Sequence, residues 1–203
     1  MQTILNAKRL QEKSFSIDER YKSNKNSKMK KLVLGALLGA GLMSAQETTN
    51  SNATPAFSGK GDQKAQVGLN LQDMGTGIMV SYDYGLGESF SFGFQAGYLL
   101  GVKEVLGDKP KFGDRVDLKA RANAHLGKVI GFPENLDLYP GLDLGLKNFG
   151  AHVGIRYFFT HGFGVFAETQ FPIAKYNTKG NGFDYLNNQF NVSVGASFDI
   201  SKR

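Results

Sequence analysis

Residues 116–126 read Val-Asp-Leu-Lys-Ala-Arg-Ala-Asn-Ala-His-Leu, with an apolar side chain at every even position. Successive side chains of a β-strand point to opposite faces, so this stretch predicts a strand with two different faces. The odd face is too polar for the water-free core of a soluble protein, because it carries Asp117, Lys119, Arg121, Asn123 and His125. The even face is a continuous apolar stripe. If the apolar face points outward the fold must be surrounded by lipid, and if the polar face points outward it must be surrounded by water.

The same alternation recurs along the chain from residue 64 onward. It predicts eight strands, over residues 64–72, 76–85, 88–100, 116–126, 136–147, 148–159, 163–173 and 189–200. Most segments are about ten to twelve residues long, which is enough to cross a bilayer when a strand is tilted. An even number of strands suits a closed antiparallel barrel. We therefore predict an all-β fold, an eight-stranded antiparallel up-and-down transmembrane β-barrel over residues 64–203.

Aromatic residues gather near the two ends of the predicted strands, and aliphatic residues lie between them. With the N-terminus on the inner side, one group falls at the inner rim: Tyr84, Phe90, Tyr157, Phe159, Phe163 and Phe198. The other falls at the outer rim: Tyr98, Phe149, Phe171 and Phe190. Two aromatic girdles around an aliphatic band are typical of a lipid-facing surface. The alternative is a soluble, lipocalin-like barrel with its apolar face inward around a hydrophobic ligand.

The first 63 residues predict three segments ahead of the barrel. Residues 29–45 begin with Met-Lys-Lys, continue with twelve apolar residues and end on Ser-Ala, which is typical of a signal peptide. Residues 1–28 are polar, and we interpret them as sequence upstream of a true start at Met29 or as a disordered leader. Residues 46–63 lack periodicity and predict a flexible spacer. Export and the barrel pattern together predict the outer membrane of a Gram-negative bacterium.

Charge and cysteine content exclude several classes of function. Residues 1–45 carry nine basic and three acidic side chains, whereas residues 46–203 carry 15 of each, so the net charge of +6 belongs to the leader. The barrel therefore has no bulk attraction for nucleic acid. The chain has no Cys, which excludes disulfides and thiolate metal sites. No metal-ligand spacing or phosphate loop occurs, and we expect no cofactor.

The chain resembles the small eight-stranded outer-membrane barrels of the OmpA/OmpX type, and among them the single-domain barrels of the Bacteroidota. The resemblance is carried by the Met29-Lys-Lys start with its Ser44-Ala-Gln end, the run Phe90–Tyr98 and the ending Phe190–Ile200. It is a resemblance of pattern, and it implies no catalytic residues. Many such barrels end on an aromatic residue that the insertion machinery recognises, whereas here Phe198 is followed by five residues.

The polar face of the strands predicts an ion-pair network that fills the lumen, because buried charges must be paired or hydrated. Its expected members are Arg115, Asp117, Lys119, Arg121, Asp137, Asp143, Arg156 and Glu168. Pairing of neighbouring strands would set Arg121 or Lys119 against Asp143 or Asp137, and Arg156 against Glu168. The alternative for the same residues is a narrow channel for small polar solutes.

The inward face also holds parts of a catalytic set, in His125, Ser91, Ser193 and Asp117, and again in His152 and Glu168. No spacing joins them, so we predict that the protein is not an enzyme. The outer loops 101–114 and 174–188 carry exposed aromatic side chains and could bind an extracellular ligand. We expect a monomer whose partners are outer-membrane lipid and the insertion machinery, with a structural or surface-interaction role.

Overall fold

The fold is described from a computed structural model. It describes residues 54–73, 75–102, 110–176, 183 and 186–201. The predicted leader, the signal peptide and the first part of the predicted spacer lie outside these residues. No helix within the described ranges is long and apolar enough to cross a membrane.

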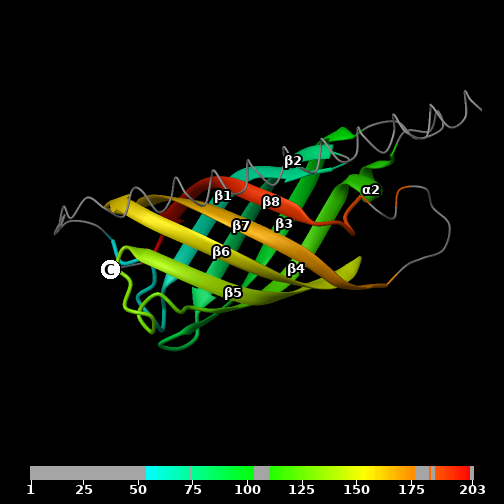
Figure 1. The fold of residues 1–203 in the computed structure, drawn as a ribbon. Coiled ribbons are helices and arrows are strands. Elements are labelled where there is room, and N and C mark those ends of the chain that lie inside the picture. The colour runs from blue at the N-terminus through cyan, green and yellow to red at the C-terminus, as the bar shows by residue number, and fades with distance from the viewer. Residues whose placement is uncertain (1–53, 74, 103–109, 177–182, 184–185, 202–203) are drawn as a thin grey trace, which may run out of the picture. The chain divides into compact units, whose positions relative to one another are not determined.

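In the described part of the chain, eight strands close into one antiparallel barrel in which each strand pairs with its neighbours in sequence (Figure 1). The strands are β1 (Gln63–Gln72), β2 (Gly75–Gly85), β3 (Phe90–Val102), β4 (Val116–Ala124), β5 (Leu136–Gly145), β6 (Asn148–Thr160), β7 (Phe163–Lys175) and β8 (Asn191–Asp199). Pairing of β1 with β8 sets Val67 against Ala196 and closes the ring. The predicted fold class is confirmed.

The strand boundaries differ from the predicted ones by a few residues. β4 ends at Ala124, two residues earlier than predicted, although the backbone N–H groups of His125 and Leu126 still donate to carbonyls of Ser89 and Leu138. Loop 101–114 ends in a four-residue helix, α2 (Phe112–Arg115), where only a loop was expected. The Asp114 carboxylate accepts a hydrogen bond from the Lys111 backbone N–H at 2.8 Å and so caps that turn.

The barrel exposes its apolar side chains and buries its charged ones. Leu69 is 55% exposed and Phe94 is 61% exposed on the outer surface, whereas Arg121 and Glu168 inside are each 1% exposed. This inverts the arrangement of a soluble barrel, in which charges face water and apolar groups fill the interior. The architecture is that of a transmembrane β-barrel, with an apolar belt outside and a polar core inside.

Aromatic side chains contact one another at both ends of the outer surface. At one end, Phe159 packs on Phe163 with ring centroids 5.2 Å apart, and Phe163 packs on Phe198 at 5.5 Å. At the other, Phe171 packs on Phe190 at 5.2 Å. These contacts lie at strand ends, as girdles do. We call the end that holds the turn between β6 and β7 the inner end, and the opposite end the outer end.

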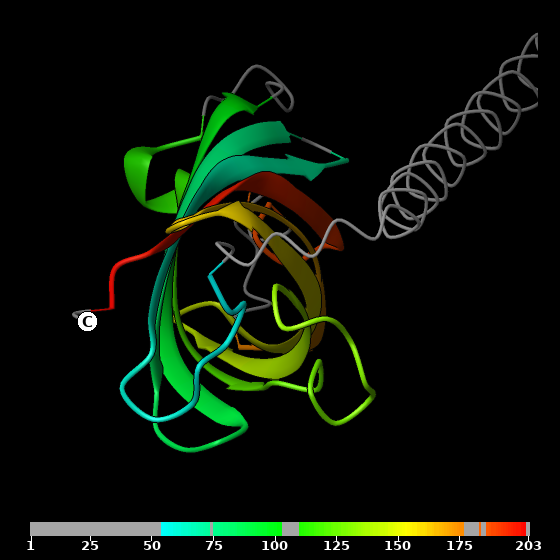
Figure 2. The same ribbon diagram turned by 90° about the vertical axis from the view of Figure 1, so that its left-hand side faces the viewer.

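Of the flexible spacer expected over residues 46–63, the structure describes residues 54–63. Residues 54–62 precede β1. These residues lie across the inner end of the barrel (Figure 2). The Phe57 ring stacks on the His125 ring with centroids 3.5 Å apart, and the Ala56 N–H donates to a carbonyl of an inner loop at 2.7 Å. The segment lacks periodicity because it caps the barrel instead of pairing as a strand. We call residues 54–62 the inner cap.

Candidate functional site in the barrel lumen

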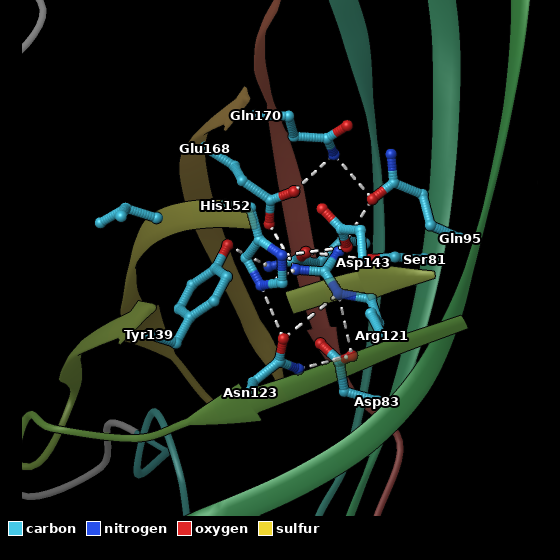
Figure 3. Close-up of polar contacts among 12 residues, drawn as sticks. Ser81, Asp83, Gln95, Arg121, Asn123, Tyr139, Asp143, His152, Glu168 and Gln170 are labelled. Atoms are coloured by element: carbon cyan, nitrogen blue, oxygen red, sulfur yellow. Dashed lines mark hydrogen bonds and ion pairs between the residues drawn. The ribbon is translucent and has the colours of Figure 1, made fainter. Parts of the chain in front are cut away.

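The Arg121 guanidinium occupies the middle of the lumen and extends from β4 across to β7. Its Nη2 donates to Glu168 Oε2 at 2.6 Å, and its Nη1 donates to Gln95 Oε1 at 3.1 Å (Figure 3). Its Nε lies 3.5 Å from Asp83 Oδ1. Three strands besides β4 thus supply acceptors to one buried cation. A planar guanidinium with five donors suits such a position better than an ammonium group.

A second layer of polar side chains lies against this cation. His152 Nδ1 lies 3.0 Å from Asp143 Oδ1, and His152 Nε2 lies 2.7 Å from Asn123 Oδ1. The Asn123 amide also donates to Asp83 Oδ1 at 2.9 Å, which closes a ring of contacts visible in Figure 3. We call Arg121, Glu168, Asp83, Asn123, His152 and Asp143 the central network.

Toward the outer end, amide and ammonium groups extend the central network. Gln170 Nε2 donates to Glu168 Oε1 and to Gln95 Oε1, each at 2.8 Å. Lys119 Nζ donates to Gln170 Oε1 at 2.8 Å and pairs with Asp117 Oδ2 at 3.2 Å. The polar contacts therefore continue toward the outer end of β4.

Toward the inner end, Arg156 and Asp137 form a further buried pair. Arg156 Nη2 lies 3.3 Å from Asp137 Oδ2, and the guanidinium carbon lies 4.8 Å from the centre of the Tyr139 ring. His125 Nδ1 lies 2.7 Å from the same Asp137 oxygen, and His125 Nε2 lies 2.8 Å from Ser91 Oγ. This part of the lumen joins a cation, a carboxylate, an imidazole and a hydroxyl.

A third ion cluster closes the barrel beside the inner cap. Lys64 Nζ lies 2.6 Å from Asp62 Oδ1 and 3.3 Å from Asp199 Oδ1. Lys64 is 1% exposed, so its charge depends on these two carboxylates. The cluster ties the cap to the first and last strands.

Side chains of opposite charge are thus distributed along the length of the lumen. A buried charge without a partner costs several kcal/mol, whereas a paired and hydrogen-bonded one is tolerated. Within the described residues, no group of three or more His, Asp or Glu side chains could hold a metal ion. The arrangement can hold the eight strands in one register and can move protons locally at its imidazoles.

Residues 47–200 match the model of a family described as "Family of unknown function (DUF6646)". The chain belongs to the DUF6646 family. The match covers the whole barrel and the inner cap, so both are within the family's extent. A search of curated proteins found no match.

A solved structure described as "De novo design of transmembrane beta-barrels" is similar to this DUF6646 protein. The similarity has a TM-score of 0.47 and 11% sequence identity, and it covers 70% of this chain and 98% of the designed one. The assignment of the fold rests on the strand pairing described above.

The structure brings most of the predicted site residues of this DUF6646 protein into the lumen. Lys119, Arg121, Asp137, Asp143, Arg156 and Glu168 are buried there, and Asp117 lies at the outer end beside Lys119. Arg115 does not join them, because it is the last residue of α2, which precedes β4, and it is partly exposed.

The predicted pairing of charges is wrong for both arginines. Arg121 pairs with Glu168 instead of Asp143, and Arg156 pairs with Asp137 instead of Glu168. Arg121 and Asp143 are neighbours in register, yet the Arg121 side chain is long enough to pass its neighbour and cross the lumen. Neighbouring strands therefore do not decide the partner of a long side chain in a narrow barrel.

Sequence reasoning missed Asp83, Gln170, Tyr139 and Lys64 as members of the lumen contacts. Asp83 and Tyr139 do occupy inward positions of the predicted alternation, so the period of two could have included them. Lys64 also occupies an inward position of the predicted strand 64–72, but its partner Asp62 could not have been found in this way, because Asp62 belongs to the inner cap.

Gly154 gives one test of packing in the lumen. It is the register partner of Tyr139, and a Cβ added at Gly154 would collide with the Tyr139 ring. Gly154→Ala should destabilise the barrel by about 1–3 kcal/mol, because the ring must leave its place over Arg156. Gly97→Ala is the matched control, since its added Cβ meets nothing closer than 3.8 Å. Urea unfolding in lipid vesicles measures both, and equal losses would contradict this packing.

His125, which lies just beyond the end of β4, gives a test by pH. Burial lowers its pKa below the ordinary value of 6.5; Arg156 adds to the lowering, and Asp137 and Asp83 oppose it. The folded state therefore prefers neutral imidazole, and its stabilisation is complete above the unfolded pKa. Stability should fall as the pH drops below about 6.5 toward the folded pKa.

The urea midpoint, measured between about pH 7.5 and pH 5.5, checks this prediction. The urea midpoint of the wild-type protein should fall as the pH is lowered over this range, and the midpoint of His125→Gln should fall less. An identical pH dependence of the two proteins would show that His125 does not contribute.

Proposed function

We propose that this DUF6646 protein is an outer-membrane β-barrel with a structural or surface-interaction role, whose lumen is filled by ion pairs. Support for the membrane location comes from the barrel itself and from the signal-peptide pattern over residues 29–45. The apolar belt would contact lipid on all sides. The loops that join the strands at the outer end would face the exterior.

The observation that carries the proposal is the inverted burial. Leu142 and Leu144 are 51% and 61% exposed on the outer face of β5, while the intervening Asp143 is 1% exposed. In water such a surface would promote association, because large apolar patches are rare on soluble monomers. In a bilayer the same surface is stabilising, and the paired lumen charges are kept away from lipid.

The lumen contacts favour a filled barrel over a narrow channel. Direct contacts at 2.6–3.1 Å link Arg121 to Glu168 and Gln95 across the lumen, and Gln170 to the same two residues. An eight-stranded barrel is only wide enough for side chains to fill. We therefore expect planar bilayers containing the protein to show no single-channel conductance, and a steady cation- or anion-selective current would favour the channel.

The partners that this function implies are outer-membrane lipid, the barrel insertion machinery and an extracellular ligand of loops 101–114 and 174–188. The described part of these loops includes α2, where Phe112 is 73% exposed and packs on Tyr98 with centroids 5.6 Å apart. An exposed aromatic ring on an outer loop suits surface recognition. We propose a monomer, since the closed sheet leaves no strand edge to pair with a second copy.

Fractionation of cells tests the proposed location. The protein should sediment with outer membranes and remain there after a carbonate wash, because a barrel is inserted in the bilayer. Unheated and heated samples should also migrate differently in gel electrophoresis, since closed barrels stay folded in the detergent until boiled. A carbonate-soluble protein with a single mobility would contradict the proposal.

A further inference from the structure

Three polar side chains from different strands meet in a hydrogen-bonded chain at the inner end of the lumen. Ser91 is the second residue of β3, His125 follows β4, and Asp137 is the second residue of β5. Ser91 Oγ lies 2.8 Å from His125 Nε2, and His125 Nδ1 lies 2.7 Å from Asp137 Oδ2. Each of the three is at most 3% exposed.

The partners decide where the imidazole proton lies. His125 Nδ1 has two close neighbours, Asp137 Oδ2 at 2.7 Å and Arg156 Nη2 at 3.1 Å. An ionised carboxylate only accepts hydrogen bonds, so we assign the proton to Nδ1 on the shorter of these contacts, which leaves Nε2 as an acceptor. The Ser91 hydroxyl then donates to Nε2. Its oxygen in turn accepts a hydrogen bond from Asn123 Nδ2 at 2.9 Å. The hydroxyl proton of Ser91 therefore points at a neutral base that a carboxylate orients.

We propose that Ser91 is an activated nucleophile, with His125 as its general base and Asp137 as the orienting acid, and that it accepts acyl groups from small esters. A nucleophile, a base and an orienting group within hydrogen-bond reach in that order are what such chemistry requires. The site goes beyond the proposed structural role, and it does not depend on membrane insertion.

The reaction balances with water as the second reactant. Ser91 Oγ attacks the ester carbonyl carbon while its proton passes to His125 Nε2, and the tetrahedral intermediate then expels the alcohol, which takes that proton. The acyl group is now esterified to Ser91. Water, deprotonated by His125, attacks the acyl carbon, and Ser91 leaves and recovers the proton as the acid is released.

Asn123 is placed to stabilise the developing oxyanion. One N–H of its amide points at Ser91 Oγ, and the amide also donates to Asp83 at 2.9 Å, which holds it in place. When Ser91 Oγ attacks the ester, the carbonyl oxygen of the substrate would lie beside the Asn123 N–H that donates to Ser91 in the free protein. Fixed donors of this kind contribute about 100-fold or more to acyl transfer.

The inner cap controls access to this site. The Phe57 ring covers the His125 ring at 3.5 Å, and beside them lies a recess lined by Phe57, Glu88, His125, Lys128, Glu134, Leu136 and Asp137. The recess has room for about one water molecule, roughly 10 Å³. Ser91 is 2% exposed and does not line this recess. The proposal therefore requires Phe57 to move off His125 before a short acyl group can reach Ser91.

Ser91 differs from the other buried serines of the lumen. Ser193 Oγ and Ser197 Oγ have no hydrogen-bond partner in the described part of the chain, and Ser81 Oγ donates to Gln66 Oε1 at 3.0 Å. Among these four serines, only Ser91 contacts an imidazole. Ser193→Ala is therefore a matched control for loss of a buried hydroxyl.

The test is covalent labelling of the full chain with a fluorophosphonate probe, followed by mass spectrometry of the labelled peptide. Labelling is compared in the wild-type protein and in the Phe57→Ala, Phe57→Leu, Ser91→Ala, His125→Gln and Ser193→Ala variants. Gel mobility of unheated samples confirms that each variant is folded. Phe57→Leu removes the aromatic ring that stacks on His125 but keeps an apolar side chain, so it opens the site where Phe57→Ala alters the fold of the inner end.

We expect Ser91 to be labelled, and faster in Phe57→Ala than in the wild type by roughly tenfold if the cap is open about a tenth of the time. Ser91→Ala should abolish labelling, Ser193→Ala should leave it unchanged, and His125→Gln, combined with Phe57→Ala, should slow it by about 100-fold or more. Release of p-nitrophenol from p-nitrophenyl acetate should follow the same order.

Two outcomes would overturn the proposal. The first is a folded Phe57→Ala or Phe57→Leu protein in which Ser91 takes up no probe. The second is labelling of Ser91 at the same rate with and without His125, which would show that the hydroxyl is merely accessible and not activated. Neither outcome affects the membrane location, which the fractionation experiment tests separately.

Discussion

Arg121→Met should lower the free energy of unfolding by about 3–5 kcal/mol, the largest loss expected from any single lumen substitution. The Arg121 guanidinium donates to Glu168 at 2.6 Å and lies 3.5 Å from Asp83. Removing it leaves the buried Glu168 without its cation and leaves Asp83 with only Arg156, whose Nη1 lies 3.9 Å from Asp83 Oδ2. Because the chain has no Trp, the folded fraction is best followed in urea by gel mobility of unheated samples.

A double substitution separates the charge from the shape of the side chain. The double variant Arg121→Met with Glu168→Gln should be more stable than Arg121→Met alone, because Glu168→Gln removes the buried carboxylate charge that has lost its cation. Lys119→Met is the matched control, because Lys119 pairs with Asp117 near the outer end, where water is closer. A loss at Lys119 equal to that at Arg121 would contradict the central position given to Arg121.

Ala122→Arg should cost about 2–4 kcal/mol in a bilayer, because it places a charge on the lipid-facing side of β4. Ala122 pairs in register with Phe92 and Leu142, both exposed on the outer face. Folding into lipid vesicles in urea, followed by gel mobility, measures the cost. If this face of β4 contacted water instead of lipid, an arginine at position 122 would cost little stability.

Ala174→Arg is the matched control for depth. Ala174 is exposed near the outer end of β7, where an arginine can reach the interface and should cost only about 0–1 kcal/mol. A harmless Ala122→Arg together with a damaging Ala174→Arg would mean that the apolar belt is not where lipid lies. Positions 121 and 122 are adjacent in β4, so Arg121→Met and Ala122→Arg test opposite faces of the same strand.

The alternation in β4 illustrates what could be predicted from sequence. A period of two decides which side chains share a face, so Lys119, Arg121 and Asn123 were expected together, and the structure places all three inside. The same reasoning extends to each strand, because one-sided burial pins the register. The eight strands and their order therefore followed from local pattern alone.

The partners of these residues could not be predicted in the same way. The distance from Arg121 to Glu168 depends on the closure of the sheet, and the two residues are 47 apart in sequence. The inner cap was missed because Phe57 lies in a segment without periodicity, and its contact with His125 exists only once the barrel is closed. Likewise, Ser91, His125 and Asp137 share no sequence spacing and meet only at the inner ends of β3, β4 and β5.

The central claim, that the exposed apolar face contacts lipid, is tested most directly by spin labels on that face. The chain lacks Cys, so Ala122→Cys, Leu142→Cys and Val194→Cys each give one labelled site. In reconstituted bilayers we predict high collision rates with oxygen, which dissolves in lipid, and low rates with a water-soluble nickel chelate. High accessibility to the nickel chelate at these three positions would contradict the account.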